Sequence, residues 1–261
     1  KYNELKKEDK TMNLKRKIKQ FLERPIKRLL PNYVVFDQNR NDRSGALFKA
    51  WGHVITNQMG GGYYEFGIYK GSSFRESYRI YQDFSKWMES QSQSSEMWRR
   101  KIKWDIEHYF YAFDTFEGMP ENTENNETFP KGSFLSSLDE VILAGEKVGM
   151  FEGEKCQYFR GLFSEVAHSR AEEIKNLRPA VIVNIDCDLY FSTVDALDMI
   201  KSKLQQGTII MMDDWNCFSS DRSKGERRAL REFLEKNSDV EIEDYFTYSQ
   251  VGKAFIVHLN K

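Results

Sequence analysis

Four aspartates stand in two pairs, each directly after a short apolar run. Asp186 and Asp188 follow the run AVIVNI, and Asp213 and Asp214 follow the run GTIIMM. One Asp in such a place is more often a helix cap or a turn residue. Carboxylates gathered at one edge repel one another unless a cation neutralises them, and a set of oxygen ligands suits a hard ion such as Mg²⁺. Two pairs therefore favour a metal site.

The residues between the pairs predict a strand, a helix and a second strand. Val181–Ile185 is short, apolar and mostly β-branched, which is typical of a strand buried on both faces of a parallel sheet. Ser192 with Asp195 forms a capping-box pattern, and Gly207 is expected to end the helix. The two strands then run in the same direction, so all four aspartates are predicted at the carboxyl edge, where open α/β sheets bind ligands.

A second candidate site is the segment EFGIYKGSSF, where a strand is expected to lead through a glycine turn into a helix. Gly67 and Gly71 permit a tight turn and close approach to a ligand, and Ser72 and Ser73 can cap the helix. The spacing G-x-x-x-G is not the dinucleotide fingerprint, and Glu65 would repel a pyrophosphate. A ligand with an ammonium or hydroxyl group is expected here instead of NAD.

A third candidate is the segment HYFYAFDTFEGMPE. Tyr109–Phe113 predicts a strand that ends at Asp114, whose carboxylate is placed to accept hydrogen bonds from a ribose diol. Thr115–Glu121 is then expected to form a loop over the same edge of the sheet. All three candidate sites are thus predicted to face one another.

Strand and helix alternate along the rest of the chain, which predicts an α/β protein with seven strands, the last two forming a hairpin. Residues 85–107 indicate an insertion or an extended helix. Further helices are expected at 46–58, 138–147, 163–175 and 225–236, and further strands at 156–160, 240–246 and 253–259.

Length and composition indicate one large core with a small appendage, since the 261 residues are 40% hydrophobic and carry a net charge of −1. No apolar run approaches the roughly 20 residues of a membrane span, and the first residues lack a signal-peptide core. A cytoplasmic protein without stable membrane insertion is expected. Cys156, Cys187 and Cys217 lack the spacing of a disulfide framework or a zinc site.

Residues 1–30 are strongly basic, with eleven Lys and Arg against four acids. Leu14, Ile18 and Phe21 recur at helical spacing beside a basic face. An anionic membrane, a nucleic acid or the acidic remainder of the chain could each bind such a helix, and the short length favours the last. Residues 1–60 are expected to form a basic helical cap on a core of residues 61–261, with no nucleic acid as partner.

Taken together and in order, four segments resemble the macrocin O-methyltransferase family of magnesium-dependent sugar methyltransferases. They are EFGIYKGSSF, FDTFEGMPE, NIDCDLYFSTVDAL and GTIIMMDDW, and the resemblance runs from about Gly61 to Val257. It implies a class I methyltransferase (Rossmann-like) fold with a seven-stranded, mostly parallel sheet that ends in an antiparallel hairpin. It further implies S-adenosylmethionine as methyl donor, Mg²⁺, a small-molecule acceptor with a sugar hydroxyl, and a homo-oligomer.

The resemblance also assigns roles to residues. Asp186, Asp213 and Asp214 match the metal ligands. The residues expected around the donor are Glu65, Gly67, Gly71, Ser73, Asp114, Thr115, Phe116 and Asp186.

The expected reaction is in-line attack of a hydroxyl on a sulfonium methyl group, which depends mainly on positioning. Chelation of two adjacent hydroxyls by Mg²⁺ would lower the pKa of the attacking one. Asp186 or Asp188 is expected to accept its proton as general base, and the resemblance favours Asp186.

Two other classes of function are compatible with the residues. Asp186-Cys187-Asp188 is also a D-x-D motif, which metal-dependent glycosyltransferases use to hold nucleotide sugars, although Asp213 and Asp214 would then have no role. A non-catalytic protein that keeps a cofactor pocket is the other alternative. The acceptor could belong to a natural product, a surface glycan, a lipid-linked precursor or a catechol-like diol.

Overall fold

A computed structural model of the protein describes residues 41–94, 106–121 and 129–260. The chain divides into two compact units, and the larger one, residues 37–82 and 102–261, contains the whole sheet. In the smaller unit, the described residues are 83–94, which form the second half of helix α3 (Ser72–Ser94). The predicted basic helix within residues 1–30 lies outside the described residues.

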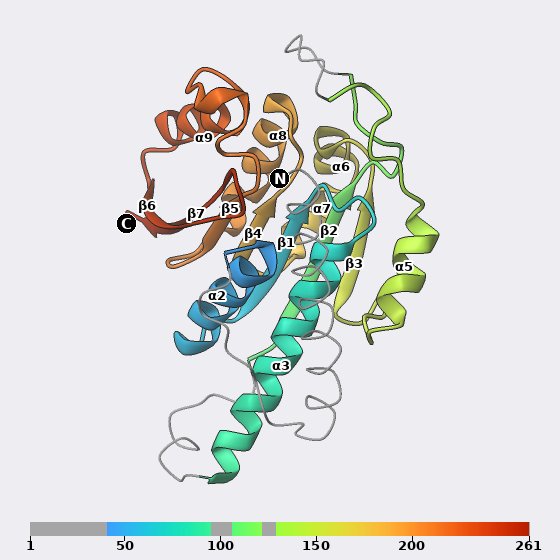
Figure 1. Ribbon diagram of the computed structural model, residues 1–261, viewed down its shortest axis with the longest axis vertical. Coiled ribbons are helices and arrows are strands. Elements are labelled where there is room, and N and C mark those ends of the chain that lie inside the picture. Colours follow the sequence, from blue (N-terminus) through green and yellow to red (C-terminus); the bar gives the residue numbers. More distant parts are fainter. Residues whose placement is uncertain (1–40, 95–105, 122–128, 261) are drawn as a thin grey trace, which may run out of the picture. The chain divides into compact units, whose positions relative to one another are not determined.

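The sheet has seven strands in the order β3-β2-β1-β4-β5-β7-β6 (Figure 1). The first five are parallel, whereas β7 runs antiparallel to both β5 and β6, as the sequence predicts. The strands are β1 (Gly61–Phe66), β2 (His108–Asp114), β3 (Cys156–Arg160), β4 (Ala180–Ile185), β5 (Ile209–Met212), β6 (Val240–Tyr248) and β7 (Gly252–Leu259).

The helices largely match the predicted ranges. Apart from α3, they are α2 (Arg43–Thr56), α5 (Leu138–Glu146), α6 (Phe163–Ser169), α7 (Ala171–Asn176), α8 (Tyr190–Ile200) and α9 (Gly225–Lys236), with short 3₁₀ turns η1 (Lys201–Lys203) and η2 (Phe218–Ser220). The helix expected at 163–175 is divided into α6 and α7, because Arg170 leaves helical geometry. None of the described helices is long and apolar enough to cross a lipid bilayer.

Helices cover both faces of the sheet (Figure 1), and alternate strand residues point to each face. On one face Tyr63 of β1 packs against Trp51 of α2, whose indole N–H donates to Ser77 Oγ of α3 at 2.8 Å. On the other face the rings of Phe66 and Phe113 stack with centroids 4.7 Å apart, in the core that α6 to α9 enclose. Both faces are therefore apolar, and β1, β2, β4 and β5 are held rigidly at the centre.

Helix α2 belongs to the same compact unit as the sheet, and it contacts β4 and β6. Its N-terminus is capped by Asp42, whose Oδ1 accepts from the Gly45 backbone N–H at 2.9 Å. The division of the chain at residue 60 stays a prediction, because most of the proposed cap lies outside the described residues.

The prediction of a capping box at Ser192 and Asp195 is wrong, as the start of α8 shows. The helix begins at Tyr190, and Ser192 lies inside it. The chain turns into the helix at Asp188, which adopts the left-handed conformation with φ of 59°. Thr193 Oγ1 then donates to the Leu189 carbonyl at 2.9 Å. Asp tolerates this conformation better than most residues, so the turn needs no glycine.

His108, at the start of β2, generates a prediction about acid stability. Its Nε2 donates to the Met59 carbonyl at 2.8 Å, its ring meets Trp51 edge-on, and burial lowers its pKa to about 4. The unfolded chain, with an ordinary His pKa of about 6.5, binds the proton more readily between these values. The free energy of unfolding should therefore fall by about 2 kcal/mol through this group between pH 7 and pH 4.5.

Urea unfolding of the wild type and of His108→Gln at both pH values measures this contribution. The free energy of unfolding of the variant should be lower than that of the wild type at pH 7. On acidification to pH 4.5 it should fall by about 2 kcal/mol less than that of the wild type. Equal losses in the two proteins would show that His108 does not carry the effect.

Candidate functional site

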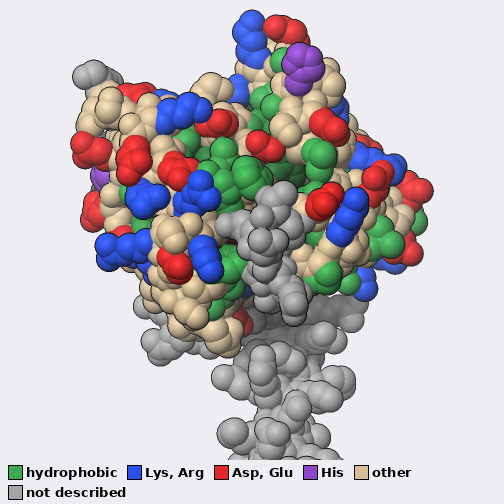
Figure 2. Space-filling model, turned by 90° about the horizontal axis from the view of Figure 1, so that it is seen from above, with side chains coloured by type: hydrophobic (Ala, Val, Ile, Leu, Met, Phe, Trp, Pro, Cys, Tyr) green, Lys and Arg blue, Asp and Glu red, His purple; other side chains and the backbone are tan. Residues whose placement is uncertain are grey.

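A cavity of about 330 Å³ opens at the carboxyl edge of the parallel strands. Its walls come from the turn after β1, the loop after β2, the ends of β4 and β5, and the first residue of α2. Figure 2 looks onto this edge from above and shows hydrophobic side chains gathered near its centre, with acidic and basic side chains around them. The three candidate sites predicted from the sequence thus share one cavity.

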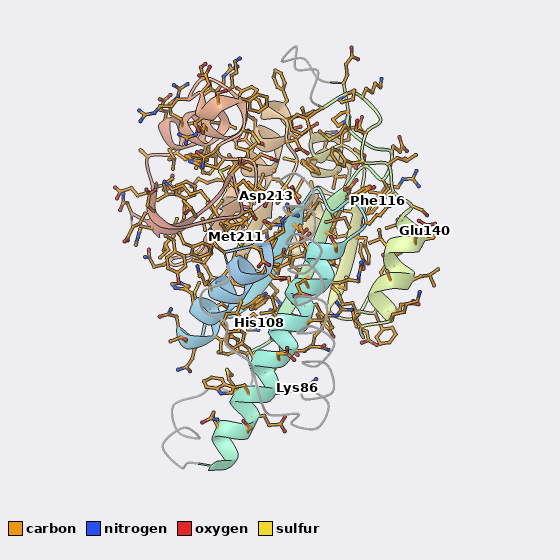
Figure 3. All side chains as sticks on the ribbon, in the orientation of Figure 1. Lys86, His108, Phe116, Glu140, Met211 and Asp213 are labelled. Carbon is orange, nitrogen blue, oxygen red and sulfur yellow. The ribbon has the colours of Figure 1, made fainter. Side chains whose placement is uncertain are left out.

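The acidic wall is held by Arg43 of α2. Its Nη1 lies 2.7 Å from Asp186 Oδ2, and its Nε donates to Asp213 Oδ1 at 3.1 Å. Its Nη2 contacts Asp213 Oδ2 as well, so one guanidinium binds Asp213 through two nitrogens and Asp186 through the third. Burial opposes the charge on Arg43, but Asp186 and Asp213 together raise its pKa above the ordinary value. In Figure 3, Asp213 lies toward the upper end of the sheet, where the cavity opens.

Asp188 and Asp214 form a second carboxyl pair in the same wall. Burial, and then repulsion by Asp214, raises the pKa of Asp188 to about 8, while burial and then Asp213 raise the pKa of Asp214. Asp188 and Asp214 therefore hold a proton more readily than an ordinary aspartate does. Burial and then Asp213 also raise the pKa of Asp186, while Arg43 opposes the rise. A carboxylate with a raised pKa is a better base near neutral pH than an ordinary one.

Glu226 of α9 is a fifth carboxyl group, directly behind this wall. It is 1% exposed, and its Oε2 accepts from the Asp214 backbone N–H at 3.1 Å. Its Oε1 has no hydrogen-bond partner among the described residues. Burial, followed by the nearby aspartates, raises the pKa of Glu226. The acid cluster is thus larger than the sequence predicted.

The predicted metal ligands are close together, but their arrangement fits a guanidinium. Carboxylate oxygens are the type of donor that Mg²⁺ prefers. Both oxygens of Asp213 and one of Asp186, however, are engaged by Arg43. Within residues 41–94, 106–121 and 129–260, no group of three or more His, Cys, Asp or Glu side chains is arranged to hold a metal ion. The described arrangement does not fit Mg²⁺.

The predicted donor residues divide into two sets. Those that line the cavity are Gly67, Ser73, Asp114, Thr115 and Asp186. Those that lie outside its lining are Glu65, Gly71 and Phe116. Of the second set, Glu65 contacts a residue of the first set from the side away from the cavity.

Glu65 is fully buried in β1 and accepts hydrogen bonds from Tyr63 and Ser73. Burial raises the pKa of Glu65 to about 7, although the hydrogen bonds from Ser73 and Tyr63 oppose the rise. Its carboxyl group therefore orients Ser73, and direct contact with a donor stays a prediction. Gly71 provides the turn before α3 with φ of 66°, and Phe116 is buried beside the loop.

Asp114 fixes the loops on both sides of the cavity. Its Oδ2 accepts from the backbone N–H groups of Ile68 and Tyr69 at 2.8 and 2.9 Å, and its Oδ1 accepts from that of Phe116 at 2.8 Å. A carboxylate offers about four acceptor positions, so these three bonds leave one for a ligand hydroxyl. Thr115 Oγ1 donates to the Gly118 carbonyl at 2.8 Å and continues the same loop.

A second recess of about 210 Å³ lies beside the main cavity and shares four residues with it: Pro120, Leu162, Phe163 and Ser192. Leu189, Tyr190 and Phe191 complete its apolar side. Phe191 and Leu162 are exposed large hydrophobic residues, at 56% and 39%. A ligand that fills the main cavity could therefore extend onto an apolar surface.

Arg43 and Glu226 were not among the residues predicted for the site. Arg43 lies before the helix that the sequence predicts at 46–58, and Asp42 as a helix cap was the one local signal that a helix begins at Arg43. Its partner Asp213 lies 170 residues away, which no local pattern reveals. Glu226 stands in the first turn of α9, where an acid is ordinary.

The turn after β1 generates a prediction about Gly67. Its φ is 83°, and a Cβ added there would lie 2.0 Å from the Asp186 carbonyl oxygen. Gly67→Ala should therefore lower the free energy of unfolding by more than the roughly 1 kcal/mol expected from conformational strain alone, and it should push Asp186 away from the cavity.

Gly153→Ala is a matched control, because its φ is also 83° but an added Cβ would meet nothing within 4 Å. Chemical denaturation of both variants separates strain from steric overlap. A loss of stability in Gly67→Ala no larger than in Gly153→Ala would contradict the close packing of the two loops.

Comparisons with known proteins bear on this geometry. The model of the macrocin O-methyltransferase family, TylF, matches residues 101–244, which is more than half of the chain. No curated protein matches the chain. The O-methyltransferase NovP is similar in structure, with 17% identity, a TM-score of 0.59, and coverage of 82% of this chain and 78% of NovP.

The calicheamicin methyltransferase CalS11 is similar too, with 18% identity and a TM-score of 0.55 over 82% of this chain and 77% of CalS11. At such identities the two structures support the fold alone, a class I methyltransferase sheet with an antiparallel C-terminal hairpin. The family match goes further, and with it the glycosyltransferase alternative loses its support. The chain belongs to the macrocin O-methyltransferase family of enzymes.

Proposed function

We propose that the protein transfers a methyl group from S-adenosylmethionine to a hydroxyl group of a sugar or glycosylated small molecule. The observation that carries the proposal is the single cavity, in which the glycine turn after β1 and the acid cluster after β4 and β5 form adjoining walls. A donor on one wall and an acceptor on the other would then meet. The family and its resemblance to sugar methyltransferases support the choice of acceptor.

The donor would occupy the wall built from β1, β2 and α3. Backbone N–H groups at the N-terminus of α3, beside Ser72 and Ser73, suit the carboxylate of its amino-acid portion. The remaining acceptor position of Asp114 suits a ribose hydroxyl. Because hydrogen bonds of Glu65 and Asp114 hold this wall without a ligand, it would need little rearrangement to receive a donor.

In the reaction, the acceptor oxygen would attack the methyl carbon of the sulfonium group in line with the carbon–sulfur bond. The electron pair of that bond stays on sulfur, which becomes a neutral thioether, and the hydroxyl proton passes to Asp186. Asp188, whose pKa is raised by burial and then by Asp214, would keep its proton and donate a hydrogen bond instead. Positioning of the two substrates supplies most of the rate.

Mg²⁺ stays a prediction from the resemblance, since Arg43 engages both oxygens of Asp213 and one oxygen of Asp186. A homo-oligomer and a cytoplasmic location stay predictions too. The apolar recess beside Phe191 would receive the part of the acceptor that lies beyond the methylated sugar.

Calorimetric titration tests the donor. S-adenosylmethionine should bind equally well with Mg²⁺ and with EDTA, because no metal ligand is expected in its wall of the cavity. Metal-dependent binding of UDP-glucose, with no binding of S-adenosylmethionine, would overturn the proposal in favour of a D-x-D transferase.

Asp186→Asn tests the base. The variant keeps the shape of the side chain but cannot accept the proton, so methyl transfer from labelled S-adenosylmethionine to a panel of glycosides with adjacent hydroxyls should fall about 10²- to 10⁴-fold. Donor affinity, measured by calorimetry, should fall by much less than the rate of transfer, even though Asp186 is also expected beside the donor. Asp198→Asn, which removes an acid of α8 that pairs with Lys236 instead, is the control and should keep full activity. Undiminished transfer by Asp186→Asn would assign the base to another group.

A further inference from the structure

The feature that the proposed reaction leaves unexplained is the cation within the acid cluster. Of the described residues that line the cavity, four are aspartates of the cluster and only Arg43 is basic. Its three nitrogens meet three carboxylate oxygens, those of Asp213 and one of Asp186. Such a planar fork matches carboxylates in a way that a Lys ammonium cannot.

The helix itself does not favour this Arg. Arg43 is the first residue of α2, and a positive charge at a helix N-terminus opposes the helix dipole. The first turn of α2 contains no acid that would offset it. The stabilisation of Arg43 therefore comes from Asp186 and Asp213, across the cavity edge.

The position of Arg43 is fixed by the surrounding contacts of α2. Ser44 Oγ donates to Glu76 Oε1 of α3 at 3.0 Å, and the Asn41 carbonyl accepts from the Ser249 backbone N–H at 2.7 Å. Farther along the helix, Trp51 is completely buried. The Arg43 side chain remains 33% exposed, so it can be reached from the cavity even though its backbone is anchored.

We propose that Arg43 is the resident cation of the acid cluster, which neutralises and positions Asp186 and Asp213 and excludes a divalent metal ion from them. The proposal concerns the acidic wall of the proposed catalytic site, and so it deepens the proposed function. It accounts for two observations at once: several carboxyl groups lie together, and yet their arrangement among the described residues does not fit a metal ion.

Binding of Mn²⁺ tests the proposal without donor, acceptor or turnover. Calorimetry and the electron paramagnetic resonance signal of free Mn²⁺ should show that Arg43→Gln binds the ion at least tenfold more tightly than the wild type. Mn²⁺ should also raise the thermal unfolding temperature of Arg43→Gln and leave that of the wild type unchanged. Adding Asp213→Asn to Arg43→Gln should remove the gained affinity.

Lys49→Gln is the matched control, because it removes one positive charge from the same helix, where Lys49 lies over the Phe246 ring. It should bind Mn²⁺ as weakly as the wild type. Arg43→Lys covers the case in which Arg43→Gln does not fold, since it keeps the charge but loses the fork, and it should bind Mn²⁺ more tightly than the wild type.

The proposal would be overturned if the wild type bound Mn²⁺ with an affinity within threefold of that of Arg43→Gln. If Arg43→Gln does not fold, the same comparison is made with Arg43→Lys. Titration of S-adenosylmethionine into the same proteins separates the two hypotheses. A variant that gains Mn²⁺ while the wild type binds no donor would support the role of Arg43 and refute the proposed function.

Discussion

The repulsion among partly buried carboxyl groups is the constraint on which the site depends. Asp186, Asp188, Asp213 and Asp214 meet because β4 and β5 are parallel neighbours and end at the same edge. Desolvation makes each negative charge costly, and proximity adds to that cost. Asp186 and Asp213 bind the Arg43 guanidinium, whereas burial and then Asp214 raise the pKa of Asp188. Residues of one type in the same wall therefore meet the repulsion in two ways, through a bound cation and through a raised pKa.

The rest of the fold serves to bring these groups to the donor wall. Gly67 passes so close to the Asp186 backbone that no side chain fits between them, which joins the turn after β1 to the end of β4. Asp114 joins the same turn to the loop after β2 by three backbone hydrogen bonds. The contact of Gly67 thus joins the two walls of the cavity, and the hydrogen bonds of Asp114 join the loops within the donor wall.

The sequence predicted the parts of this arrangement that depend on local pattern. Apolar β-branched runs located β4 and β5, and strand ends located all four aspartates, because parallel strands of a βαβ unit share one edge. The predicted start of α8 was wrong. Ser192 lies inside the helix, and the chain enters the helix through a left-handed turn at Asp188. The contact of Glu65 with the donor stays a prediction, and its hydrogen bond from Ser73 lies between residues that no local pattern shows to be in contact.

Arg43 shows why the other part of the site could not be predicted from the sequence. Its neighbours in the sequence, Asp42 and Ser44, explain only where a helix begins. Its role follows from the packing of α2 on the sheet, which places its first residue beside strand ends more than 140 residues later. The acids that predicted a metal site can also be neutralised by an arginine, because either cation offsets the repulsion among the carboxylates. The acid cluster therefore specifies a positive charge, and the packing of α2 decides whether that charge is a metal ion or a guanidinium.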